Sequence, residues 1–310
     1  MNNETITAVQ GLKVGHAHDE RAMTGCTAII FEPEVDVACE ARGGRPGTYD
    51  THSIEVTKTF VKKHAIFLTG GDVFGFDVAI GIRRYLLEAG LASNIGAGKL
   101  PGIVGADIYD LEYAHIKDVD YSDLGYNACI GASSQPVQQG NVGGGMGATV
   151  GKLKGMSFAS KGGCGTSLRH LPKGVLVGAL VITNAMGNIY DLETGKTLAG
   201  VRNPEGGFLE FEDVMDSYPQ ELTSQSNTTI GIVATNADLS HEQLTKVVQI
   251  AHDGLAMSIR PVHTSLDGDT LFAASTAKIT GIRDAPGIVD IVGYAAARCI
   301  AAAVVNSVKS

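Results

Sequence analysis

The sequence predicts a layered α/β sandwich, in which sheets of buried strands pack against amphipathic helices. Short apolar runs of strand length recur along the chain, at 65–69, 103–107, 175–183 and 229–235. Runs with helical apolar spacing occur as well, but strands and helices do not alternate strictly. A doubly wound parallel sheet would require that alternation, so packed layers of sheet and helix are favoured over a Rossmann-type fold.

The composition is typical of a well-packed globular protein. Of the 310 residues, 44% are hydrophobic and 18% are charged, which supports a substantial core and excludes a disordered chain. The formal net charge is −9, and no cluster of lysine and arginine is interleaved with aromatic residues. We therefore expect a single domain over 1–310 that has no nucleic-acid partner.

The cysteines and the two ends of the sequence indicate the cellular compartment of the protein. Five cysteines without a C-x-x-C pair favour reduced thiols in the cytoplasm over a disulfide framework. Residues 1–10 are polar and acidic, unlike a signal peptide. The apolar run 288–305 contains Asp290 and Arg298, which indicates a buried core helix rather than a membrane span. We expect a cytoplasmic protein with no membrane partner.

The first elements of the chain are predicted strands. The runs 27–31 and 35–38 are rich in apolar residues and are separated by Glu32-Pro33-Glu34, which predicts two strands joined by a turn. The loop at 42–48 is rich in glycine and contains Arg42 and Arg45. A solvated turn and an anion site both fit this loop.

A strand followed by a helix is predicted next. The buried strand at 65–69 leads through two glycines into an amphipathic run at 73–88. Gly90 stands where a helix C-cap glycine belongs. The run 103–110, which contains Tyr109, is then predicted as a strand that leads into a loop.

The glycine-rich stretch at 140–151 ends at Lys152 and resembles a phosphate-binding loop only superficially. Met146 stands where the first glycine of a Walker A motif should be, and Leu153 replaces the serine or threonine that would bind magnesium. We therefore expect no nucleotide cofactor. No clustered metal ligands stand at metal-binding spacing, so no metal site is expected either.

The chain from 191 to 227 is polar and contains several glycines and prolines, which predicts an exposed linker. It ends at Asn227-Thr228-Thr229, where a β-branched strand begins. An ordinary strand start explains this pattern, because threonine favours strands. A self-cleavage site between Asn227 and Thr228 also explains it. Beyond this strand, Ser240 and Gln243 form a capping-box pattern that predicts a helix.

Cleavage there would give Thr228 the chemistry of an N-terminal nucleophile. A free α-amine has a pKa of roughly 7.7–8.0, so part of it is neutral near pH 7. The amine can take the proton of the hydroxyl on the same residue, directly or through water. One residue then supplies both nucleophile and base.

Several motifs in the chain resemble the self-processing DmpA peptidase family. Beside 227–230, they are the runs 24–27, 41–44, 68–71, 108–110, 151–152, 234–236, 261–264 and 267–272. They occur in the family's order over nearly the whole chain. The resemblance implies an αββα sandwich of the DmpA and ornithine acetyltransferase type. It also implies cleavage into an α chain, 1–227, and a β chain, 228–310.

The resemblance also assigns roles to residues scattered along the chain. It implies Thr228 as the nucleophile, Lys152 and Asn184 beside it, Tyr109 with Asn184 as oxyanion or substrate contacts, and Asp267 and Asp269 as groups that orient the amine and the lysine. A lysine near the hydroxyl would stabilise developing negative charge. Two carboxylates would balance the buried cations. By spacing alone, Asp267-Gly268-Asp269 fits a turn and Lys152 fits a surface lysine.

The activity implied is amide hydrolysis through an acyl-enzyme on Thr228. The expected substrate is a small amide or a short peptide, with no cofactor, and the processed units are expected to form homo-oligomers, commonly tetramers. An acyltransferase like ornithine acetyltransferase, which also uses an internal threonine, is the alternative. A processed scaffold without activity is the non-enzymatic alternative. Members that act as aminopeptidases have Gly-Ser at the cut, whereas this chain has Asn227-Thr228, so the substrate stays open.

Overall fold

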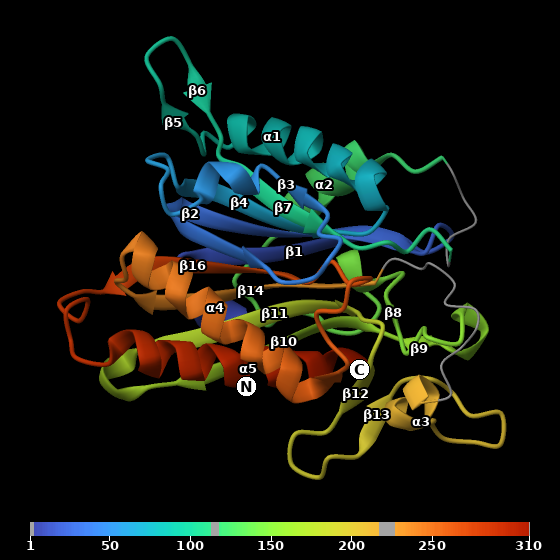
Figure 1. Ribbon diagram of the computed structural model, residues 1–310. Helices are drawn as coiled ribbons and strands as arrows, with labels where there is room; N and C mark the ends of the chain where they lie inside the picture. Colours follow the sequence, from blue (N-terminus) through green and yellow to red (C-terminus); the bar gives the residue numbers. More distant parts are fainter. Residues whose placement is uncertain (1–2, 113–117, 217–226, 310) are drawn as a thin grey trace.

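The computed structural model describes residues 3–112, 118–216 and 227–309, and its elements form four layers in the order helix, sheet, sheet, helix (Figure 1). A single nine-stranded sheet supplies both inner layers. Its strands run β10-β11-β14-β16-β2-β4-β7-β3, and β1 pairs with β2 beside this path. The predicted αββα sandwich is therefore confirmed.

The strand β2 (Thr24–Ala41) connects the two halves of this sheet. Its first part pairs antiparallel with β1 (Leu12–Asp19) and β4 (Lys62–Thr69), and its last part pairs with β16 (Thr270–Ile279). The sequence predicted two strands and a turn here, which is wrong. One strand continues through the segment at 32–34, where the register with β4 jumps from Ile30–Ala65 to Val35–Lys63, so this segment forms a bulge between two paired stretches.

The helices α4 (His241–Ser258) and α5 (Ile288–Lys309) cover one half of the sheet. That half consists of β16, β10 (Gly163–His170), β11 (Leu176–Asn184) and β14 (Thr228–Ala237). The predicted capping box is present: the Ser240 side chain accepts from the Gln243 N–H, and the Gln243 side chain accepts from the Ser240 N–H.

The other half of the sheet lies against α1 (Val78–Glu88) and α2 (Tyr121–Ile130). Its strands are β1, β4, β7 (Ile103–Asp107) and the short β3 (Thr48–Tyr49), together with the first part of β2. Two small hairpin-like pairs lie outside the main sheet: β5 (Ser93–Asn94) with β6 (Lys99–Leu100), and β8 (Thr149–Val150) with β9 (Ser160–Lys161).

An apolar core lies between the two halves of the sheet. In β14, Ile230 and Ile232 face this core, whereas Val233 faces the layer of α4 and α5. Both faces of the strand are therefore buried. This explains why its sequence is a nearly continuous β-branched run rather than an alternating one.

The helix α5 is the one described helix long and apolar enough to span a membrane by length and composition. In the structure, 61% of its apolar window is buried inside the molecule. It packs on α4, β10 and β11. The run at 288–305, which was predicted to be a core helix, is therefore packed inside the molecule as a core helix is.

The polar segment predicted as an exposed linker is structured over much of its length. It contains β13 (Thr197–Ala199), which pairs with β12 (Asn188–Tyr190), and the short helix α3 (Phe211–Asp216). The strand β12 also pairs with β15 (Ile259–Arg260). The linker prediction is wrong for this part, because backbone pairing and buried Phe211 and Val214 hold it on the domain. Residues 217–226 of the predicted linker lie outside the described residues.

Candidate active site

Thr228 is the first residue of β14 and lies at the centre of the α4–α5 half of the sheet. Its side chain is buried, and β14 pairs antiparallel with β11 on one side and parallel with β16 on the other. Asn184, the last residue of β11, is its direct partner across the strand pair. Sheet register therefore brings two predicted site residues, 44 positions apart in the sequence, side by side.

The carbonyl group of Asn227 receives two hydrogen bonds. The Thr228 hydroxyl donates to this oxygen at 2.5 Å, and the Gly268 backbone N–H donates to it at 2.6 Å. The Asn227 N–H donates to the Leu266 carbonyl at 3.1 Å. The peptide group before Thr228 is thus held by the turn that precedes β16, with the hydroxyl beside it.

Gly268 is required at this turn because there is no room for a side chain. A Cβ there would lie 2.5 Å from the Arg45 carbonyl oxygen and 2.7 Å from the Thr228 hydroxyl. The predicted turn at 267–269 therefore places one backbone hydrogen-bond donor, the Gly268 N–H, at the Asn227 carbonyl.

Lys152 is a buried cation bonded to Asn184. Its Nζ donates to the Asn184 backbone oxygen at 2.9 Å and to Oδ1 at 2.8 Å. Burial lowers the pKa of Lys152 to about 7, although the negative charge of Asp267 opposes this effect. The lysine therefore loses its proton more readily than an ordinary lysine.

Asn184 organises the groups around Lys152. Its Oδ1 also accepts from the Thr149 N–H at 3.0 Å, and its Nδ2 donates to the Tyr109 backbone carbonyl at 3.1 Å. The contact with Tyr109 thus uses the main chain. The Tyr109 side chain is partly exposed, and burial raises the pKa of its hydroxyl.

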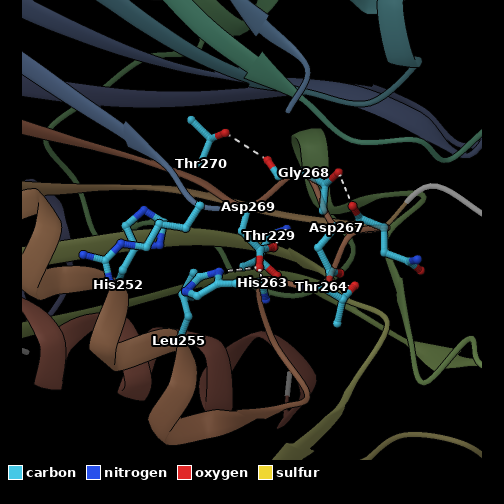
Figure 2. Close-up of polar contacts among 12 residues, drawn as sticks. Thr229, His252, Leu255, His263, Thr264, Asp267, Gly268, Asp269 and Thr270 are labelled. Carbon is cyan, nitrogen blue, oxygen red and sulfur yellow. Dashed lines mark hydrogen bonds and ion pairs between the residues drawn. The ribbon is translucent and has the colours of Figure 1, made fainter. Parts of the chain in front are cut away.

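The carboxylates of Asp267 and Asp269 accept hydrogen bonds from two consecutive residues before the turn, Thr264 and His263 respectively (Figure 2). Asp267 Oδ2 accepts from the Thr264 N–H at 3.0 Å and from its hydroxyl at 2.6 Å, and Oδ1 accepts weakly from the Met186 N–H at 3.4 Å. Burial and the charge of Asp269 raise the pKa of Asp267 to about 6.

Asp269 is the carboxylate nearest to the start of β14. Its Oδ1 accepts from the Thr229 N–H at 2.7 Å. Its Oδ2 accepts from the His263 backbone N–H at 3.0 Å and from the His263 imidazole at 2.8 Å. Among the described residues, neither Asp269 nor Asp267 forms an ion pair with Lys152. Orientation of an amine by these carboxylates stays a prediction.

The arginine-containing loop before β3 packs its backbone on this turn. The N–H of Arg42 donates to the Asp269 carbonyl at 2.9 Å, and that of Arg45 donates to the Asp267 carbonyl at 2.9 Å. Gly43 lies between them, and a Cβ there would stand 2.3 Å from the Asp267 carbonyl oxygen. The loop thus serves the site through its backbone rather than as a free solvated turn.

Sequence reasoning missed three residues of this site: His263, Thr264 and Gly268. The first two lie in the 261–264 run on which the family resemblance partly rests, so their signal was present but no role followed from it. Nothing in the sequence indicates that the Gly268 backbone N–H meets Asn227, because that contact depends on how distant segments pack. In the part of the chain that the structure describes, no group of three or more His, Cys, Asp or Glu could hold a metal ion.

Comparisons with known proteins place this chain in a family. The model of peptidase family S58 matches residues 4–310. An uncharacterized aminopeptidase of Mycobacterium leprae is 34% identical over 98% of this chain and 90% of its own length. A 6-aminohexanoate-oligomer endohydrolase of Paenarthrobacter ureafaciens is 30% identical over 87% of this chain and 74% of its own length.

A solved structure has the same fold. The L-aminopeptidase D-Ala-esterase/amidase of Ochrobactrum anthropi, described as a variant of the Ntn hydrolase fold, superposes with a TM-score of 0.69 and 22% identity. The match covers 98% of this chain and 85% of that one. The whole-length family match and these sequence relatives lead to one conclusion: the chain belongs to peptidase family S58.

Proposed function

We propose that this protein cleaves its own chain between Asn227 and Thr228, and then hydrolyses amide bonds with Thr228 as the nucleophile. The observation that carries this proposal is the geometry at the Asn227 carbonyl, which has the Thr228 hydroxyl on one side and the Gly268 N–H on the other. A fixed donor on a carbonyl oxygen stabilises the negative charge that develops there during attack. A hydroxyl held beside that carbonyl supplies the proximity that attack requires.

Self-cleavage proceeds through an ester. The Thr228 oxygen attacks the Asn227 carbonyl carbon and gives up its proton, for which the neutral form of Lys152 is the base that we propose. The bond to the Thr228 nitrogen breaks, and that nitrogen takes a proton to become an amine. Water then hydrolyses the ester, which releases the Asn227 carboxylate and restores the hydroxyl.

The mature site repeats this chemistry on a substrate. The free amine of Thr228 serves as the base, the hydroxyl attacks the substrate amide carbon, and an amine product leaves. Water then hydrolyses the acyl-enzyme. The Gly268 N–H, freed from Asn227, is the oxyanion donor that we propose, together with the predicted contacts of Asn184 and Tyr109.

The substrate class that we propose is a small amide or a short peptide. The relatives reported above bear the names aminopeptidase and oligomer endohydrolase, so both terminal and internal amide bonds are candidates. These names belong to amide hydrolases, and the acyltransferase alternative is therefore not favoured.

We also propose a cytoplasmic location and a homo-oligomer, a tetramer of processed units. The five cysteines are free, and four of them are buried, which suits a reducing compartment.

Sedimentation of the purified protein tests the proposed tetramer. We expect four pairs of α and β chains in one particle.

The test of the function compares Thr228→Ala and Thr228→Ser with wild type, and Thr57→Ala serves as a control on an exposed threonine. Wild type and Thr57→Ala should yield fragments that begin at Met1 and Thr228 by intact mass and N-terminal sequencing. Substrates are aminoacyl p-nitroanilides, β-amino amides and 6-aminohexanoate oligomers.

Thr228→Ala should stay intact and lose turnover by at least a thousandfold. Thr228→Ser should retain part of both activities, since it keeps a hydroxyl. An active Thr228→Ala variant would refute the proposed nucleophile. A wild-type chain that turns over substrate while intact would refute the requirement for cleavage.

A further inference from the structure

His263 is the main partner of the buried carboxylate that holds the start of β14. Asp269 is 1% exposed, and two of its three donors come from His263: the backbone N–H at 3.0 Å and the imidazole Nδ1 at 2.8 Å, both on Oδ2 (Figure 2). Its other oxygen, Oδ1, accepts from the Thr229 N–H at 2.7 Å. One carboxylate therefore joins the imidazole to the residue that follows the nucleophile.

The backbone of His263 is unusual for a residue with a side chain. Its φ is 56°, in the left-handed region, which costs a non-glycine residue on the order of 1 kcal/mol. Glycine adopts this conformation freely, and asparagine, aspartate and histidine adopt it more readily than other residues. The backbone therefore admits a histidine at this position, and the contacts of its imidazole show what the side chain does there.

The proton of this imidazole can be placed from its contacts. The Nε2 of His263 is buried and has no hydrogen-bond partner in the described part of the molecule, so a proton there would be unsatisfied. Nδ1 faces the Asp269 carboxylate, which requires a donor. A proton on Nδ1 fits both environments.

A second histidine holds the ring in place. His252, fully buried on α4, packs edge-on against His263, with ring centroids 4.9 Å apart and an angle of 61° between the planes. The Nε2 of His252 lies 2.9 Å from the Glu40 carbonyl oxygen, which anchors it to β2. The His263 ring is thereby confined between His252 and Asp269.

We propose that His263 is a positioning residue that acts through Asp269 on the nucleophile, an inference that rests on the function proposed above. By donating to Oδ2, His263 orients the carboxylate so that Oδ1 holds the Thr229 N–H. That bond fixes the first peptide of β14 and, with it, the direction of the Thr228 hydroxyl. None of the contacts of His263 described above reaches Thr228, so its effect is one of geometry.

The test separates the imidazole from the backbone at this position. His263→Gly removes the donor and relieves the left-handed conformation, whereas His263→Asn keeps a side-chain N–H that can reach the carboxylate. The control is His52→Asn, since His52 Nδ1 lies 2.9 Å from Glu55 Oε1 in an exposed pair. Self-cleavage is timed after cell-free synthesis, and kcat and KM are measured on the mature protein.

His263→Gly should lower the self-cleavage rate and kcat at least tenfold, with KM within twofold and Tm within a few degrees of wild type. His263→Asn should recover both rates to within threefold of wild type, and His52→Asn should match wild type. Wild-type rates in His263→Gly would overturn the proposal. So would rates in His263→Asn that are no better than in His263→Gly at equal Tm.

A direct readout does not depend on activity. In an uncleaved Thr228→Ala background, amide-resolved hydrogen exchange by NMR should show at least tenfold faster exchange at Thr229 in His263→Gly, with Ile232 of the same strand unchanged. Unchanged protection at Thr229 would overturn the role of His263. Suppose that the wild-type protein neither cleaves nor hydrolyses, whereas His263→Gly still speeds exchange at Thr229 in the Thr228→Ala background. That result would overturn only the proposed function.

Discussion

The environment of Lys152 differs from that of an ordinary lysine, which is exposed to solvent. Lys152 is 4% exposed, and it contacts two oxygens of Asn184 rather than a carboxylate. A charge buried in this way without an ion-pair partner destabilises the fold. Its lowered pKa of about 7 reflects that cost. The same shift makes a neutral amine available for proton transfer at physiological pH.

Lys152→Met in an uncleaved Thr228→Ala background should raise the free energy of unfolding by about 2 kcal/mol at pH 7. The folded pKa of Lys152, about 7, lies below the ordinary 10.5. Between these values the unfolded chain binds more protons, so the unfolding free energy of the lysine protein rises with pH. The advantage of the methionine variant should shrink from pH 7 to pH 10.

Thermal and urea unfolding across this pH range measure the effect. Lys154→Met, at an exposed position two residues away, should show no such pH dependence. A methionine variant less stable than its parent at pH 7, or an advantage that does not change with pH, would contradict the assignment of a buried, partly neutral lysine.

The polar groups at this scale were only partly predictable. The family motifs single out Thr228, Lys152, Asn184 and the two aspartates, because a motif specifies the side chain at each of its positions. The Gly268 donor is a backbone group, and every residue except proline has one. Its role arises only because the turn at 267–269 meets Asn227, as shown by the bridge between Asn227 and Asp267.

At the scale of elements, a loop between β2 and β3 holds the turn at 267–269 through its backbone. The segment from Arg42 to Arg45 donates backbone N–H groups to the carbonyls of Asp267 and Asp269. It thereby links the end of β2 to the turn before β16. The glycines of this loop allow the close approach, since side chains would collide with the turn.

Gly43→Ala should slow self-cleavage at least tenfold and lower stability by about 1–3 kcal/mol, because its Cβ would meet the Asp267 carbonyl oxygen at 2.3 Å and the Asp269 nitrogen at 2.5 Å. Gly98→Ala is the matched control, since nothing lies within 4 Å of its Cβ. Cleavage time courses and urea unfolding give the two quantities. Equal cleavage rates in the two variants would show that the loop does not position the turn.

The boundaries of elements were predicted well where the local signal was strong. Ser240 and Gln243 marked the start of α4, and the apolar run after Thr228 marked β14. The strand β2 was misjudged, because Pro33 and its glutamate neighbours carry a turn signal. Pairing with β4 before and after this segment, and with β16 after it, keeps the chain in one strand, and the turn signal corresponds to a bulge at 32–34. Local propensity is a weak guide wherever tertiary pairing supplies partners on both sides.

At the scale of the whole molecule, the cut that we propose lies inside the main sheet. The strand β14 pairs with β11 of the α-chain segment, and β16 pairs with β2 of that segment. The helix α5 packs on β10 and β11. The 228–310 segment is therefore built into the fold on every side rather than attached to it.

The two fragments should consequently stay together after cleavage. Under native conditions they should elute as one peak at the volume of the intact Thr228→Ala protein, and they should separate only in denaturant. Size-exclusion chromatography followed by denaturing gels measures this. Release of a free β chain in native buffer would contradict the pairing of β14 with β11.

By itself, the sequence determined the layered α/β architecture and the family, and resemblance to that family named the side chains for the chemistry that we propose. These depend on periodicity, composition and motif order along the chain. Only the tertiary structure decided which groups meet the Asn227 carbonyl, which carboxylate holds Thr229, and which groups surround His263. Those contacts depend on sheet register and on burial, and both are set by segments that are far apart in the sequence.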